Sequence, residues 1–521
     1  MAMDQAQLPI NIDVQTLRAL VVEKLQIIAD RDLIIARHER TITERDANIA
    51  KLNAEIARLR RAQFAARSEK MDPAQRALFD ETMAEDIAAV EAQLEALQST
   101  PADAADTSRP RRAPKRRALP EDLERVETRH EPDSCTCGQC GGDLVHINDH
   151  VSEKLSCRPL TFFVRRDVYP QYACRACETI TAVPVAPTII DRGIAAPDLL
   201  AQVIVAKYVD HLPLYRQEAI YARSGVAIPR STQGEWIGAC GVALQPLVGC
   251  LHRELRAQPI LHADETPVAM LEPGTGKTRR SYLFVYRSGI GPPLVVFDFC
   301  TSRSGEHARR FLGDYPGALM VDDYSGYKAS FAKGVIELGC WAHARRKFVD
   351  QHKASGSEVA REAIERIAVL YHIEAQAKPM TVQERLAHRQ HYAVPALHAI
   401  KTWLDALRPQ ILGNSGTANA IDYTLRRWSA LIRYADDGTY PIDNNPAENA
   451  IRPIAVGRKN WLFAGSETAG KRAAAIMSLL ATARANGHEP YAWLTDVLTR
   501  LPNTLDRDID SLLPHRWKPV A

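Results

Sequence analysis

Pro259-Ile-Leu-His-Ala-Asp264-Glu-Thr-Pro267 is the stretch around which this chain is organised. The pattern predicts a short apolar strand that ends on a carboxylate, with Pro267 limiting its extension. A second apolar run, Leu319-Met-Val-Asp322, also ends on a carboxylate, and Asp443-Asn-Asn-Pro-Ala-Glu448 is typical of a helix start. Three carboxylates on separate elements can hold two hard divalent cations around a phosphate. The sequence therefore predicts a metal-dependent site for phosphate chemistry.

Length, composition and net charge constrain the class of protein. A chain of 521 residues allows about three or four domains, and an apolar fraction of 46% can build an ordinary core. The net charge of +3 says nothing about partners, so local clusters must carry that argument. No run reaches transmembrane length and the N-terminus lacks the features of a signal peptide. We expect an intracellular protein without a membrane partner, whose ten cysteines are metal ligands or buried thiols rather than disulfides.

Residues 1–97 are expected to form a helical region. No glycine or proline occurs between Leu17 and Phe64. Apolar residues recur every seven positions, at Val21, Ile28, Ile35, Ile42, Ile49 and Ile56. This spacing predicts a long helix and a parallel coiled coil, hence a homodimer or a higher oligomer. In several heptads the second position of the coiled-coil interface is a charged residue, which weakens the apolar interface. A helix folded onto its own domain is the alternative.

Residues 98–122 are expected to be a basic, proline-rich linker. The run Arg109-Pro-Arg-Arg-Ala-Pro-Lys-Arg-Arg117 carries six cations and no acid, which favours a polyanionic partner. A solvated hinge that binds nothing is the alternative. The candidate contacts to DNA phosphates in this run are Arg111, Arg112, Arg116 and Arg117.

Residues 123–190 are expected to bind structural zinc. Two Cys-x2-Cys pairs, Cys137 with Cys140 and Cys174 with Cys177, stand in glycine-containing or short-turn contexts that let two thiolates face one ion. The 33 residues between the pairs suit an inserted strand. Cys135 is a spare thiol that could replace Cys137 as a ligand.

Residues 191–255 read as successive helices. A helix over 196–208, a second over 214–224 and a third beginning at Ser231 or Thr232 follow the helix-turn-helix pattern. A plain three-helix packing unit is an equal alternative to a DNA reader.

Residues 256–475 are expected to form an α/β domain. Three strands, 260–263, 281–286 and 294–299, are close enough for an antiparallel meander. Two more, 318–321 and 334–338, alternate with helices and are expected to be parallel neighbours. Helical patterning over 356–435 indicates a helical insertion, and residues 476–521 indicate a helical tail.

Long motifs carry a resemblance to a known family. They are Leu261-His-Ala-Asp-Glu-Thr-Pro-Val268, Ser302-Arg-Ser-Gly-Glu-His307, Cys340-Trp-Ala-His-Ala-Arg-Arg-Lys-Phe348, Asp443-Asn-Asn-Pro-Ala-Glu-Asn-Ala-Ile-Arg-Pro453 and Gly457-Arg-Lys-Asn-Trp-Leu-Phe-Ala-Gly465. Over essentially its whole length the chain resembles the transposases of the insertion sequence 66 family. The resemblance implies a ribonuclease-H-like catalytic fold with an Asp-Asp-Glu triad, interrupted by a helical insertion before the Glu.

The resemblance also implies a reaction and its residues. Asp264, Asp322 and Glu448 would be the catalytic ligands of two Mg²⁺ or Mn²⁺ ions, and the enzyme would cut and join DNA in the bacterial cytoplasm, in association with the nucleoid. The implied partners are terminal inverted repeats, target DNA and small accessory proteins of the same element. Cations near the site suit DNA phosphates; they are Arg345, Arg346, Lys347, Arg452, Arg458 and Lys459.

Alternatives stand beside this assignment. Asp323 directly follows Asp322, although strand alternation lets only one of them enter the site. Glu448 could instead close a capping box with Asn445 as the N-cap residue. At the level of function, a structure-selective nuclease or resolvase and a non-enzymatic, zinc-dependent DNA-binding regulator are the rivals.

Overall fold

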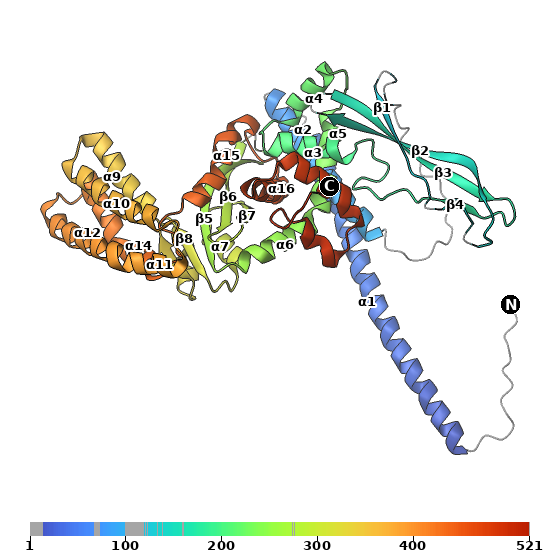
Figure 1. The fold of residues 1–521 in the computed structure, drawn as a ribbon, viewed down its shortest axis with the longest axis horizontal. Helices are drawn as coiled ribbons and strands as arrows, with labels where there is room; N and C mark the ends of the chain where they lie inside the picture. Colours follow the sequence, from blue (N-terminus) through green and yellow to red (C-terminus); the bar gives the residue numbers. More distant parts are fainter. Residues whose placement is uncertain are drawn as a thin grey trace.

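The computed structural model describes residues 14–66, 73–98, 119, 121, 123–132, 134–137, 139–158, 161–272, 275 and 277–519. A central α/β body carries three outlying parts: a long N-terminal helix, an extended sheet near one end and a helical lobe at the other (Figure 1). The four arginines expected to contact DNA between residues 109 and 117 lie outside the described residues.

The central sheet has the strand order β7-β6-β5-β8-β9. Antiparallel pairing joins β5 (Ile260–Glu272), β6 (Lys277–Ser288) and β7 (Val295–Cys300), and parallel pairing joins β5, β8 (Ala318–Val321) and β9 (Ile336–Gly339). The expected meander and parallel neighbours are therefore confirmed. The parallel connections run through α7 (Gly305–Leu312) and the short helix α8 (Lys328–Phe331), because parallel strands need a crossover.

Strand β5 is longer than the sequence suggested. Pro267 was expected to limit it, but pairing with β6 continues through Pro267 as far as Glu272. Pairing with β8 stops at His262, so Pro267 lies in a part of β5 that no longer borders that strand. A proline is tolerated there because it lacks only one ladder hydrogen bond at a local sheet edge.

Both faces of this sheet are buried. On β6, Leu283 and Val285 contribute to an apolar cluster with α15 (Asn445–Trp461) and α16 (Glu467–Ala485). The alternating residues Phe284 and Tyr286 contribute to the main core of the body. Hydroxyls of α16 also accept hydrogen bonds from backbone N–H groups of the edge strand β7, at 2.8 and 3.0 Å, which protects that edge.

The helical lobe follows β9 and has an apolar core of its own. The helical patterning expected over 356–435 is confirmed, and the lobe begins one helix earlier. Its helices are α9 (Trp341–Ser355), α10 (Glu358–Ala377), α11 (Val382–His388), α12 (Val394–Leu407), α13 (Gly416–Arg426) and α14 (Trp428–Ile432).

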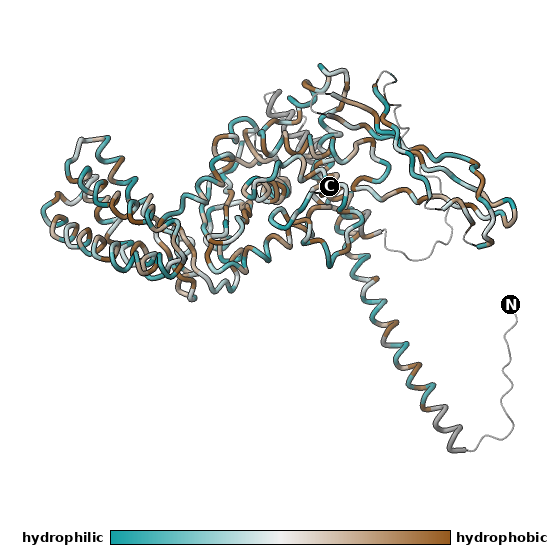
Figure 2. Tube along the Cα trace, viewed as in Figure 1, coloured by the Kyte–Doolittle hydropathy of each residue, from teal (hydrophilic) through white to brown (hydrophobic). Residues whose placement is uncertain are grey.

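Among the described side chains of the long N-terminal helix α1 (Val14–Ala66), those that pack against the body lie toward its C-terminal end. Ile56 and Leu59 are buried against α2 (Pro73–Gln98). The rest projects away from the body, and apolar positions recur along it (Figure 2). Ile28, Ile35 and Ile42 are 54%, 54% and 57% exposed. One end of the heptad pattern therefore folds onto its own domain, whereas the middle offers an unpaired stripe.

Helix α2 is fixed to the body by a buried ion cluster. Arg472 of α16 donates to Glu85 at 2.9 Å and to Asp86 at 3.1 Å, and Lys207 lies 3.1 Å from Glu85. Gly238 lies on α5 (Arg230–Ala243), and a Cβ there would come within 2.5 Å of the Glu85 carbonyl oxygen. Only glycine therefore lets α5 approach α2 this closely. Removing one partner from such a cluster leaves an uncompensated charge in the core.

The expected helices of 191–255 are present as α3 (Pro197–Tyr208), α4 (Leu214–Arg223), α5 (Arg230–Ala243) and α6 (Gln245–Arg256). The helix in the position of a DNA reader, α5, is mostly buried and lies under α2. This arrangement favours the packing-unit alternative. Within the described ranges no single helix is long and apolar enough to cross a membrane; the bent pair α5 and α6 passes by length and composition only.

Candidate active site and zinc site

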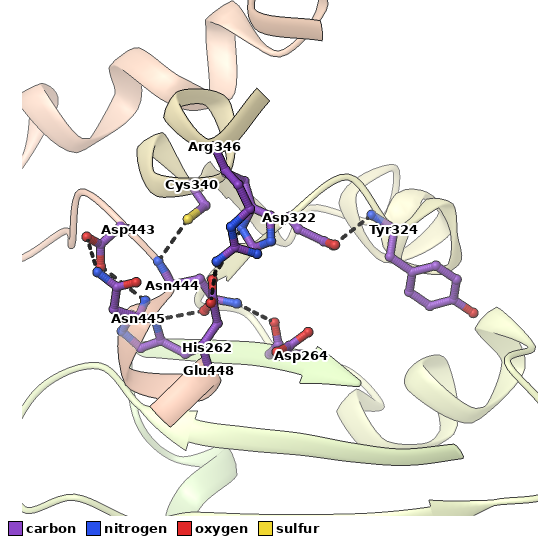
Figure 3. A network of polar contacts seen from close by, with 12 residues as sticks. His262, Asp264, Asp322, Tyr324, Cys340, Arg346, Asp443, Asn444, Asn445 and Glu448 are labelled. Atoms are coloured by element: carbon purple, nitrogen blue, oxygen red, sulfur yellow. Dashed lines mark hydrogen bonds and ion pairs between the residues drawn. The ribbon is translucent and has the colours of Figure 1, made fainter. Parts of the chain in front are cut away.

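Three carboxylates converge at one edge of the central sheet (Figure 3). Parallel pairing aligns Ile260 with Ala318 and His262 with Met320. The same register, continued by two residues, sets Asp264 of β5 level with Asp322, which directly follows β8. The period of two in a strand then puts both on the same face. Glu448 reaches this edge from the first turn of α15.

The neighbouring carboxylates affect the pKa of Asp264. Burial, and then the nearby charges of Glu265, Asp322 and Glu448, raise the pKa of Asp264 to about 7, against a hydrogen bond from the Glu265 N–H. Glu448 Oε1 is buried and makes no hydrogen bond. Closely spaced carboxylates with an unmet oxygen are the donor set that Mg²⁺ or Mn²⁺ requires. The residues present fit a hard divalent cation.

Asp264→Asn is expected to stabilise the metal-free protein. Between these two pKa values, the Asp264 carboxyl keeps its proton in the folded protein, where its pKa is about 7, and has lost it in the unfolded chain, where its pKa is near 3.8. Stability from this group therefore falls as pH rises from about 4 to about 7. The full shift corresponds to about 4 kcal/mol at most.

Thermal unfolding in EDTA at pH 5 and pH 8 measures this effect. The gain of Asp264→Asn over wild type should be larger at pH 8, and Mg²⁺ should stabilise wild type but not Asp264→Asn. The control Asp323→Asn should behave like wild type in both respects. Equal pH dependence in wild type and Asp264→Asn would contradict the arrangement.

Asp323 points away from the site. Its carboxylate lies 2.9 Å from Arg426 and 3.6 Å from Arg427, on the side of the helical lobe. Asp322 instead accepts the Tyr324 N–H at 2.9 Å. The geometry thus separates the two neighbouring aspartates, with Asp322 on the side of Asp264.

The capping-box alternative for Glu448 is wrong. The N-cap residue is Asn444, and Glu448 gives it no side-chain hydrogen bond. The Asn444 N–H donates instead to Cys340 Sγ at 3.1 Å. Glu448 Oε2 accepts from Arg346 Nη2 at 2.9 Å. The carboxylate is therefore free of a capping duty and faces the cations of α9.

Asn444 and His262 form a latch that sequence reasoning missed. Asn444 is fully buried. Its Nδ2 donates to the Ala263 carbonyl at 2.8 Å, and its Oδ1 lies 3.0 Å from His262 Nδ1. Since the amide oxygen can only accept, His262 donates from Nδ1. The latch ties the start of α15, which carries Glu448, to the strand that carries Asp264 (Figure 3).

A matched pair of substitutions tests the latch. The amide nitrogen of asparagine at position 262 can replace the imidazole Nδ1, whereas that of glutamine falls nearer the Nε2 position. His262→Gln leaves the buried Asn444 oxygen unpaired, at a cost of about 1–3 kcal/mol. We expect His262→Gln to lose roughly tenfold or more in metal-dependent cleavage per folded molecule, and His262→Asn to recover most of it. Equal losses in both variants would remove the positioning role.

The expected DNA-contacting cations differ in their availability. Arg345, Arg346 and Lys347 are exposed on the first turns of α9, and Arg452 and Lys459 are exposed on α15. Arg458 is half-buried and donates to Thr266 Oγ1 and to the Pro267 carbonyl. It anchors α15 to β5 through Nη1.

Arg303 is a cation that sequence reasoning did not single out. It donates from Nε to Glu265 Oε1 at 2.9 Å, and its guanidinium lies 4.4 Å from the ring centre of Tyr324. Glu265 and Tyr324 neighbour the two site aspartates in the chain. The Ser302–His307 motif contains this residue, but only the fold shows why it reaches the site.

A second candidate metal site lies at the end of the extended sheet. Sulfurs of Cys137, Cys140, Cys174 and Cys177 all lie within 4.8 Å of one another, with the shortest separations at 3.3, 3.5 and 3.6 Å. Four thiolates at about 2.3 Å from one zinc ion would stand about 3.8 Å apart. Cys135 is exposed and outside the group. The cluster therefore supports structural zinc.

The fold explains how distant cysteines meet. Antiparallel pairing of β2 (Leu144–Arg158) and β3 (Thr161–Cys174) sets Leu144 opposite Cys174. The first Cys pair precedes β2 and the second closes β3, so both stand at the same end of the hairpin. Hydrogen bonding with Thr179 lowers the pKa of the Cys177 thiol to about 6, which favours the thiolate that zinc binds.

Comparison with family models covers most of the chain. Residues 192–472 match the Transposase IS66 family and residues 478–515 match the IS66 C-terminal element. Residues 134–178 match the zinc-finger binding domain of transposase IS66, and residues 51–128 match the model described as Transposase C of IS166 homeodomain. The resemblance drawn from the motifs is confirmed.

Similar proteins occur in Sinorhizobium fredii (strain NBRC 101917 / NGR234). The uncharacterized protein y4jD is 36% identical over 77% of this chain and 81% of its own length. The uncharacterized protein y4qI is 36% identical over 89% of this chain and 88% of its own length. Taken with the matched models, these relatives establish that the chain belongs to the IS66 family of transposases.

Proposed function

We propose that this protein is an active transposase that binds the terminal inverted repeats of its element, cuts DNA there and joins the freed ends to target DNA. The observation that carries the proposal is the meeting of Asp264, Asp322 and Glu448 from β5, the end of β8 and the start of α15. The sheet order and the helical lobe between β9 and α15 agree with a ribonuclease-H-like catalytic fold.

Asp264, Asp322 and Glu448 would hold two Mg²⁺ or Mn²⁺ ions, which when bound make water a better nucleophile and stabilise the leaving 3′ oxygen of a phosphodiester. The chain's own residues position everything else. Asn444 ties the start of α15, which carries Glu448, to the backbone next to Asp264. Arg346 is paired with Glu448 and would be available to bind a phosphate when that carboxylate holds a cation. The freed 3′-hydroxyl would then take the place of water and attack a phosphodiester of the target DNA, from which the target strand's own 3′ oxygen leaves.

DNA would reach the site along the exposed cations of α9. Arg345, Arg346 and Lys353 line a groove that also contains Tyr371 and Asn445. Phosphate contacts of this kind fix the register of a duplex without reading its sequence. Sequence-selective binding of the ends is assigned to residues before 250, which include the zinc unit and the basic run at 109–117.

Two protomers would bring two ends together through α1. Its exposed isoleucines keep the seven-residue spacing of a coiled-coil seam. Ile28→Lys combined with Ile35→Lys is expected to shift the full chain from dimer to monomer. Light scattering of the wild-type chain that gives a monomer at micromolar concentration would contradict the dimer.

Cleavage of a labelled duplex that carries an element end and its flanking DNA tests the reaction. We expect a nick at the 3′ end of the element that requires Mg²⁺ or Mn²⁺ and stops in EDTA. Cutting of unrelated branched DNA as fast as the duplex that carries the element end would favour the structure-selective nuclease. Binding without any cutting in either metal would favour the zinc-dependent regulator. The need for accessory proteins of the same element is tested by adding them to the same reaction.

A further inference from the structure

Beside the carboxylate site, three potential metal-binding atoms of different chemistry meet. A sulfur, an imidazole nitrogen and a carboxylate oxygen, from Cys340, His343 and Glu448, lie within 4.8 Å of one another. Cys340 is the N-cap residue of α9 and His343 lies in its first turn. Glu448 enters from the first turn of α15. Two helix starts thus bring together a ligand pair three residues apart and a third ligand from far along the chain.

Two polar atoms of this cluster have no hydrogen-bond partner. His343 Nδ1 and Glu448 Oε1 lie 3.5 Å apart, and both are buried without a hydrogen bond. Arg346 engages the other oxygen of Glu448. Cys340 Sγ accepts backbone N–H groups, among them that of Asn444 at 3.1 Å, as metal-binding thiolates commonly do when backbone amides orient them. Leaving two buried polar atoms unpaired costs free energy, which a shared cation would recover.

The donor set selects a class of ion. Sulfur, nitrogen and one carboxylate oxygen suit zinc, cobalt or cadmium, whereas Mg²⁺ keeps an oxygen shell. Ligands bonded at 2.0–2.3 Å to a tetrahedral ion stand about 3.5 Å apart, which is the separation of His343 Nδ1 and Glu448 Oε1. A thiolate and a carboxylate would balance the two charges of the ion, and three protein ligands leave a fourth position open.

We propose that Cys340, His343 and Glu448 bind one zinc-class divalent ion, separate from the structural zinc, and that this ion draws Glu448 away from the catalytic ions and inhibits cleavage. The thiol of Cys340 gives up its proton to solvent when the ion binds. The binding stands on the cluster alone. The inhibition rests on the proposed function, because it requires that Glu448 serve the cleavage site.

Cobalt titration of the full-length protein tests the binding. The protein is first shown to carry one zinc per chain, and Co²⁺ is then added, because it does not compete well with zinc for four thiolates. We expect one further equivalent of Co²⁺ with a thiolate-to-cobalt absorption band that excess Mg²⁺ does not remove. Cys340→Ser and His343→Ala should lose the band or reduce cobalt affinity by about 10–100-fold.

The control is Cys157→Ser, which alters a buried thiol in another part of the core and should keep the band. The serine in Cys340→Ser still accepts the Asn444 N–H, and unchanged thermal unfolding verifies its fold. Absence of the band in wild type, or its persistence in Cys340→Ser, overturns the site.

A cleavage assay with fixed Mg²⁺ and rising Zn²⁺ tests the inhibition. Each rate is expressed relative to the same variant without zinc. Wild type should lose activity at lower zinc than Cys340→Ser, by about tenfold or more in concentration. Equal sensitivity would overturn the inhibitory role. If no variant cleaves in Mg²⁺, the proposed function fails, and the cobalt result still decides whether the ion binds.

Discussion

Asp322→Asn is expected to reduce metal-dependent cleavage by about 10³-fold or more, whereas Asp323→Asn should stay within a few-fold of wild type. Metal ions contribute several kcal/mol to a phosphoryl-transfer transition state, and each 1.36 kcal/mol is a factor of ten in rate. Asp322 stands level with Asp264 across the β5–β8 pairing. Asp323 is held by Arg426 and Arg427 on the other side.

The pair of variants is a sharp comparison because the two residues are identical and adjacent. Each substitution removes one charge from the same turn. Single-turnover cleavage with saturating enzyme separates the chemical step from DNA binding, which both variants should keep. A large loss in Asp323→Asn together with normal cutting by Asp322→Asn would reverse the assignment. Equal losses would indicate that the turn, rather than a metal ligand, is at stake.

Cys174→Ser is expected to abolish zinc binding and, with it, selective binding of the element's ends. Zinc held by four thiolates contributes on the order of 10 kcal/mol to the local fold. The apolar cluster at this site is small, with Cys137, Leu144, Cys174 and Tyr172 as its members. So little apolar burial cannot replace the ion.

The matched control is Cys135→Ser, whose thiol is exposed and outside the cluster. Zinc analysis should give one ion per chain for the control and close to none for Cys174→Ser. Limited proteolysis should then cut Cys174→Ser within residues 134–178, while the thermal transition of the central body stays in place. Zinc retained by Cys174→Ser, or lost by Cys135→Ser, would contradict this ligand set.

The sequence was informative where the chemistry is local. Strand alternation and helix punctuation placed β6, β7, β8 and the start of β5 within a few residues, and the spacing of two Cys-x2-Cys pairs predicted the cluster that the fold assembles. Carboxylates at strand ends and at a helix start pointed to one site. The family came from long motifs, which encode more than periodicity does.

Long-range contacts were beyond the sequence. The extension of β5 through Pro267 depends on pairing with β6, which tertiary structure decides. Asn444 and His262 are 182 residues apart, so a polar triplet before α15 suggested a cap but not its partner. The covering of α5 by α2 depends on Gly238 and on the buried charges around Arg472. The role of each of these residues depends on a distant partner, so its local sequence does not single it out.

Asp264, Asp322 and Glu448 are proposed to serve the joining of DNA as well as its cutting. A strand-transfer assay tests it, with labelled element ends, a supercoiled target, Mg²⁺ or Mn²⁺, and wild type beside Asp264→Asn. We expect joined products from wild type and none from the variant, which should still bind the ends. Cutting without joining, even with accessory proteins of the element present, or joined products from Asp264→Asn, would contradict the claim.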